Sequence, residues 1–189
     1  MNTLFIDTHG EMVVLALYKS ERLIKKKEGT ERQDHSTICM PLLVELLTEE
    51  KITIHDINDI VVVNGPGSFT GVRIGVTIAK TLAYTLKIPI RTITSLELYL
   101  ENIKEENYLV LNEKNGYYVG KIEKRQISEY EYIKAKDFDN WKQEKNIAIC
   151  TEINYENLIT FAHQKDPLNP HIVNPFYVKK IEVENDKKS

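Results

Sequence analysis

The order of apolar and polar residues along the chain predicts an α/β protein whose first half is the more regular. Short apolar runs with a period of two indicate strands, and apolar residues three and four positions apart indicate helices. Residues 60–63 form a continuous β-branched run, which is typical of a strand buried on both faces. The elements expected in the first half are strands 4–8, 11–18 and 22–28, helix 35–51, strand 60–63, helix 71–87, strand 89–93 and helix 95–103.

The second half has a weaker pattern, and a charged stretch at residues 104–107 separates it from the first. Its expected elements are strands 108–111, 117–122 and 127–133, helix 137–145, strand 146–150 and helix 155–163. We therefore predict two lobes, one of residues 1–104 and a reduced one of residues 105–189. An antiparallel meander that leads into parallel strand pairing is the layout of ribonuclease H-like folds. Proteins of the actin and sugar-kinase group contain two such units. The expected fold class is α/β, with actin-like or sugar-kinase (ribonuclease H-like) lobes built from mixed sheets and helices.

Composition narrows the classes of protein that the chain fits. The net charge of −3 provides no overall basic field that would attract nucleic acid or an anionic membrane. No apolar run approaches the ~20 residues of a membrane helix, and the first residues show no signal-peptide pattern. Cys39 and Cys150 form no paired motif, as expected for reduced thiols in a cytoplasmic protein.

Residues 64–75 contain four of the chain's eight glycines and lead directly into the second helix. Such loops often hold phosphate, but this one lacks the Gly-Lys-Ser/Thr of the Walker pattern and the third glycine of the dinucleotide pattern. Ser68 and Thr70 are candidates to cap the helix or to touch an anion at its start, and capping is the commoner role. An autonomous nucleotide site remains the less favoured alternative.

The second helix has an apolar arc of roughly 200°, wider than the ~100° stripe that packing on one sheet requires. Small residues recur at every fourth position inside that arc and let another backbone come close. The candidate partner-contact residues are Gly71, Val72, Gly75, Val76, Ala79 and Ala83. Burial inside the chain's own domain explains the same pattern equally well, and both interpretations stay open.

Arg73 lies in the first turn of this helix, where the helix dipole disfavours a cation. The charge should therefore be compensated. We expect a carboxylate of the chain itself, with a bound anion or an acidic group of a partner as the alternative.

The stretch GPGSFTGVRIG, residues 65–75, closely resembles the hallmark of the bacterial TsaB family, also called YeaZ. Ile6-Asp7-Thr8 resembles the end of the family's first strand, and Ile88-Pro89 follows the second helix as in the family. His35-Ser36 with Pro41 and two leucines resembles the first-helix pattern. The resemblance covers about the first hundred residues.

The resemblance implies a non-catalytic scaffold in the synthesis of threonylcarbamoyladenosine, a modified tRNA base. Family members pair with the catalytic paralogue TsaD through their first two helices, and the ATPase TsaE joins them. The resemblance thus implies no cofactor of the chain's own, with ATP and metal on the partner subunits. It also implies a homodimer when the chain is alone, and contact with tRNA only through the complex.

The residues themselves agree with a chain that has no catalytic group or metal ligand of its own. Catalytic relatives carry a His-x-x-x-His pair where this chain has residues 92–99, which contain no histidine. Asp7 stands where actin-like ATPases keep a magnesium-associated acid, although a strand-end aspartate is more often a turn residue. Two alternatives stay open: a homodimeric binding module, and a nucleotide-binding or peptidase-like enzyme of the same fold, for which Ser36 beside His35 is a weak candidate pair.

Overall fold

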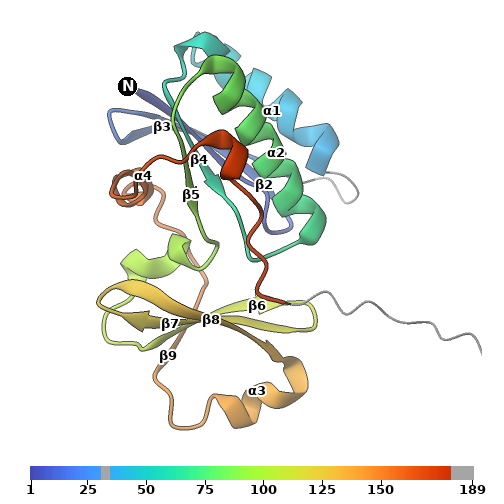
Figure 1. Cartoon of the computed structure of the whole chain (residues 1–189), viewed down its shortest axis with the longest axis vertical. Helices are drawn as coiled ribbons and strands as arrows, with labels where there is room; N and C mark the ends of the chain where they lie inside the picture. Colours follow the sequence, from blue (N-terminus) through green and yellow to red (C-terminus); the bar gives the residue numbers. More distant parts are fainter. Residues whose placement is uncertain (31–34, 180–189) are drawn as a thin grey trace, which may run out of the picture.

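The computed structural model describes residues 1–30 and 35–179, and the side chains of residues 35 and 36 lie outside this description. The described chain forms two sheets, one above the other in Figure 1. The first sheet has the order β3-β2-β1-β4-β5 and the second the order β8-β7-β6-β9. The strands of the first sheet are β1 (Asn2–Asp7), β2 (Val13–Lys19), β3 (Arg22–Gly29), β4 (Asp59–Val63) and β5 (Ile90–Ile93).

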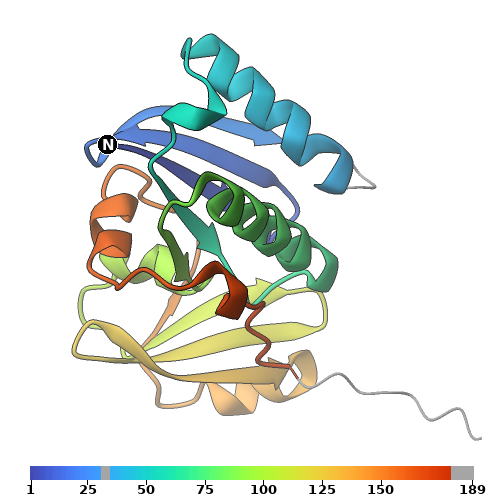
Figure 2. The ribbon, with the colours of Figure 1, turned by 45° about the horizontal axis from the view of Figure 1, so that its top comes forward.

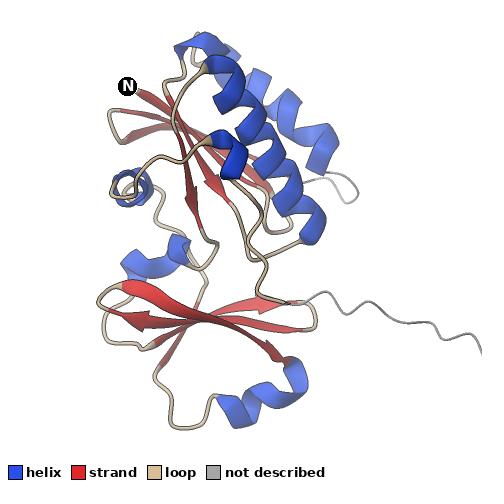
Figure 3. Cartoon of the chain, viewed as in Figure 1, coloured by secondary structure: helices blue, strands red, loops and turns tan. Residues whose placement is uncertain are grey.

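The first sheet is antiparallel on one side and parallel on the other. The first three strands pair as the expected meander, whereas β4 pairs in parallel with both β1 and β5. Helices α1 (His35–Glu49) and α2 (Phe69–Leu86) provide the crossovers into and out of β4, and both lie on the same face of the sheet (Figure 3). This is the helix-covered parallel arrangement that the continuous β-branched run predicts.

Alternation along each strand divides the apolar residues between two cores. In β4, Ile60 and Val62 pack beneath α1 and α2, while Val61 and Val63 point to the opposite face. That opposite face packs against the second sheet and against two short helical segments. These segments are η2 (Glu97–Asn102) and α4 (Leu158–His163). The first sheet is therefore buried on both faces.

The second sheet is a meander closed by one parallel strand, and α3 covers its outer face with an aromatic cluster. Its elements are β6 (Tyr108–Glu113), β7 (Gly116–Glu123), β8 (Gln126–Lys134), α3 (Ala135–Trp141) and β9 (Ile147–Ile149). Phe138 of α3 stacks on Tyr117 of β7, with ring centroids 3.7 Å apart. Mixed sheets with helices, the fold class expected from the sequence, are thus confirmed.

After the second sheet the chain returns to the first, as the positions of α4 and η3 (Pro170–Ile172) show in Figure 2. His163 of α4 reaches the buried Asp59 at the start of β4, with His163 Nε2 3.1 Å from Asp59 Oδ2. Arg91 of β5 pairs with the same carboxylate. Residues 103–107 connect η2 to β6 of the second sheet, and residues 158–173 pack on the first sheet. The division into lobes of residues 1–104 and 105–189 stays a prediction.

The predicted helix 95–103 is the short 3-10 helix η2, which begins at Glu97, two residues later than expected. The hydroxyl of Ser95 donates to the carbonyl of Pro66 at 2.5 Å. Thr94 and Glu97 are joined by two hydrogen bonds: the hydroxyl of Thr94 accepts from the amide of Glu97, and the Glu97 carboxylate accepts from the amide of Thr94 at 2.7 Å. This reciprocal pair is the capping-box arrangement.

Candidate partner interface

The glycine-rich loop after β4 is filled by the chain's own backbone. A Cβ at Gly65, which has φ +111°, would lie 2.6 Å from the carbonyl oxygen of Phe176. A Cβ at Gly67 would overlap the carbonyl oxygen of His9. The amide of Ser68 donates to that same carbonyl at 2.8 Å. These glycines admit close backbone neighbours, and the amides of Ser68 and Gly71 already donate to groups of the chain itself.

Asp7 and His9 form a buried pair at the end of β1, beside this loop. Oδ1 of Asp7 accepts from the backbone amide of His9 at 3.0 Å and lies 2.6 Å from its Nδ1. Burial alone would lower the pKa of His9, but the adjacent Asp7 carboxylate outweighs burial and holds the pKa above its ordinary value. Asp7 is thus engaged as a turn residue at the strand end.

The Asp7–His9 pair predicts a pH dependence of stability. Because the folded-state pKa of His9 is raised, the pair's contribution is complete below the ordinary value of about 6.5 and is lost as pH rises through the raised value. We expect the denaturant midpoint to fall across that window, and His9→Gln to flatten the fall. The same substitution at exposed His55 is the control. A His9→Gln variant that keeps the full pH dependence would contradict the assignment.

The small residues of α2 face the chain's own sheet. Gly71, Val72, Gly75, Val76, Ala79 and Ala83 are all buried in the single chain. The hydroxyl of Thr8 donates to the carbonyl of Gly71 at 2.6 Å, and a Cβ at Gly75 would overlap that hydroxyl. Internal packing therefore accounts for this stripe. A role for these six residues in contacting a partner stays a prediction.

The start of α2 is capped as the commoner interpretation expects. The hydroxyl of Ser68 accepts from the amide of Gly71 at 3.2 Å, and Thr70 is exposed one residue into the helix. Arg73 does not have the carboxylate partner that we expected within the described part of the chain. Instead its guanidinium lies 3.7 Å from the centroid of the Phe69 ring, and its Nε donates to the hydroxyl of Tyr177 at 2.8 Å.

The sides of α1 and α2 that face away from the sheet carry exposed apolar side chains. The exposed fractions are 43% for Met40 and 60% for Val44 on α1, and 42% for Phe69 and 63% for Tyr84 on α2. The two helices also contact each other. Both helices thus present exposed apolar side chains that a partner can cover.

The described residues contain no group of three or more histidines, cysteines or acids that could hold a metal ion. His9 and His163 are engaged with carboxylates, and His171 packs against Tyr84. The side chains of His35 and Ser36, the weak candidate pair, lie outside the described residues. Burial raises the pKa of Cys39 to about 11, so this thiol is not an activated nucleophile. In the described part of the chain, no helix is long and apolar enough to span a membrane.

Comparisons with known proteins show which family model and which solved structures the chain resembles. Residues 21–114 match the family model described as TsaD, tRNA N6-adenosine threonylcarbamoyltransferase. The fold resembles YeaZ from Pseudomonas aeruginosa, with a TM-score of 0.73 and 17% identity over 93% of this chain and 99% of that one. The chain therefore has the YeaZ fold.

The curated relatives that match the chain include proteins named TsaB. The chain is 42% identical over 102 residues to the tRNA threonylcarbamoyladenosine biosynthesis protein TsaB of Bacillus subtilis, covering 54% of this chain and 44% of that protein. It is 32% identical over 118 residues to TsaB of Buchnera aphidicola subsp. Schizaphis graminum, covering 60% and 56%. The chain spans about half the length of the curated relatives it matches. The chain is therefore similar in sequence to TsaB proteins over its first half, and similar in fold to YeaZ over most of its length.

Proposed function

We propose that the chain is a non-catalytic subunit of the machinery that forms threonylcarbamoyladenosine in tRNA, and that it pairs with the catalytic subunit TsaD. The observation that carries this proposal is the family match over residues 21–114, which contain all of α1 and α2. Their outward sides present the exposed apolar residues that a partner would bury. Buried core packing beneath both helices holds this surface in place.

The site chemistry supports a scaffold in preference to an enzyme. The glycine loop is occupied by its own backbone, and Asp7 is engaged by His9. ATP and metal would then be supplied by partner subunits, with TsaE as the ATPase, and tRNA would be contacted only through the complex. The proposed location is the cytoplasm. When TsaD is absent, the same exposed surface would pair two copies of the chain.

The proposal is tested by measuring binding between the purified chain and TsaD from the same organism. We expect saturable binding with a defined stoichiometry, and loss of the modified base from tRNA when the gene is deleted. The chain alone should show no ATP hydrolysis and no threonylcarbamoyl transfer. Turnover by rigorously purified chain would contradict the non-catalytic role. Normal tRNA modification in the deletion strain would contradict the proposed role of the chain in this modification.

A further inference from the structure

Arg73 is the centre of an exposed cluster that joins α2 to the last described residues of the chain. Phe69 and Tyr177 stack with ring centroids 5.2 Å apart, and their side chains are 42% and 41% exposed. The guanidinium of Arg73 lies against the Phe69 ring, and the hydroxyl of Tyr177 holds its Nε. We call these three residues the Arg73 cluster. Its guanidinium plane is held in one orientation, with the terminal nitrogens bonded to no group of the described chain.

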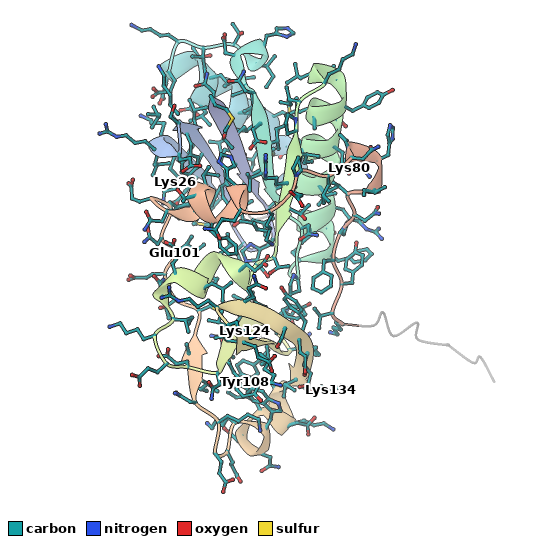
Figure 4. The ribbon with its side chains drawn as sticks, turned by 60° about the vertical axis from the view of Figure 1, so that its left-hand side comes forward. Lys26, Lys80, Glu101, Tyr108, Lys124 and Lys134 are labelled. Carbon is teal, nitrogen blue, oxygen red and sulfur yellow. The ribbon has the colours of Figure 1, made fainter. Side chains whose placement is uncertain are left out.

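The segment that supplies Tyr177 lies along the same side of α2. Lys80 Nζ donates to the carbonyl of His171 at 3.4 Å, and the His171 ring packs on Tyr84 at 5.0 Å. Figure 4 shows Lys80 on the side of α2 next to η3. Val173 between these contacts is buried in the core beneath α2. The segment 170–179 is thus fastened along α2, and it orients the Arg73 cluster from outside the helix.

The charge of this surface is unlike that of the whole chain. The chain carries 28 acidic and 25 basic residues, yet no acid occurs between Asp59 and Glu97 or between Asp166 and Lys179. These two stretches include all of α2 and the segment fastened along it. They contribute the cations Arg73, Lys80 and Lys87, and no acidic residue, to this part of the chain. A cation in the first turn of a helix is also opposed by the helix dipole.

We propose that the Arg73 cluster receives a carboxylate from an acidic segment of the partner protein. A planar guanidinium with free terminal nitrogens matches the two oxygens of a carboxylate, and flanking aromatic rings exclude water from the contact. Arginine and tyrosine are also the residues that dominate binding energy at protein interfaces. This inference rests on the proposed function, because the partner it invokes is TsaD. It states the chemistry of that contact and adds to it Tyr177, which lies outside α1 and α2. Tyr177 is a positioning residue, since it acts through Arg73.

The test compares variants of the full chain by titration with TsaD and by association and dissociation kinetics. Arg73→Gln should raise Kd at least about tenfold, mostly through faster dissociation. Arg73→Lys should lose much of the same affinity, because it keeps the charge without the planar fork. Tyr177→Phe keeps the ring stack but releases Nε, so a several-fold rise in Kd is expected. The control is Lys87, which is exposed at the C-terminal end of α2: Lys87→Gln removes the same charge and should change Kd by less than about threefold.

The outcomes separate this inference from the function on which it rests. If the parent chain does not bind TsaD, the proposed function fails. If the parent binds and Arg73→Gln binds equally well, the carboxylate contact is overturned while the function stands. Equal losses of affinity in Arg73→Gln and Lys87→Gln would show that only the overall charge matters, and would also overturn the carboxylate contact. A change confined to self-association would make a second copy of the chain the occupant. Unfolding midpoints are measured on every variant, and Tyr177→Phe remains decisive if Arg73→Gln does not fold.

Discussion

Replacing Arg91 by glutamine is expected to lower the free energy of unfolding by about 3–5 kcal/mol. Asp59 begins β4, an interior strand of the first sheet, and its side chain is only 1% exposed. Burial raises the pKa of this carboxyl, and Arg91 is the strongest of the charges that oppose the rise. Without Arg91 the carboxylate keeps only His163, so it must stay charged in a poorly solvated place or take up a proton.

The measurement is the denaturant midpoint, with the slope of the transition recorded to confirm that the same surface is exposed on unfolding. Arg22→Gln is the matched control, because Arg22 is an exposed residue of the edge strand β3. We expect the control to keep the parent midpoint. Equal midpoints for the two variants would show that the Asp59–Arg91 pair does not stabilise the sheet.

Replacing Ala79 by leucine is expected to lower the free energy of unfolding by about 1–3 kcal/mol, through overpacking. Ala79 is 0% exposed and lies in the core between α2 and the first sheet. The neighbouring Val72 and Val76 are also buried, so the three added carbon atoms have no free space. The folded fraction should bind TsaD with the parent affinity.

Thr77→Leu is the control for Ala79→Leu, since Thr77 is exposed on the same helix. It should leave the unfolding midpoint close to that of the parent. The stripe of small residues would instead be a partner contact if Ala79→Leu kept the parent midpoint and bound TsaD at least tenfold more weakly. Measuring both quantities on each variant therefore decides between the two interpretations that the sequence left open.

Much of the first lobe could be predicted because its signals are local. The β-branched run at residues 60–63 is a strand buried on both faces, and the period of three to four after the glycine loop is α2. The pattern also placed Ser68 at the start of the helix. The pattern could not show what the small residues of α2 pack against, because a wide apolar arc fits a sheet, a neighbouring helix or a partner.

The contacts missed by sequence reasoning join residues that are far apart in the chain. Arg73 bonds to Tyr177, 104 residues away in the chain, and not to the carboxylate that was expected. His163 meets Asp59 across the same separation of 104 residues. Asp59 lies just before the predicted strand 60–63, and only the parallel pairing of β4 with β5 brings Arg91 beside it. An acid just before a buried strand, with an arginine early in the next parallel strand, is the signal that could have found this pair.

The return of α4 to the first sheet has a consequence for the order in which the chain acquires its structure during synthesis. Leu158, Ile159 and Ala162 cover part of the sheet face that also carries Phe5 and Val61. A nascent chain that has not yet reached residue 158 lacks this cover and lacks His163 beside Asp59. The N-terminal sheet therefore reaches its final packing only after α4 has left the ribosome, and until then its uncovered apolar face is open to chaperones.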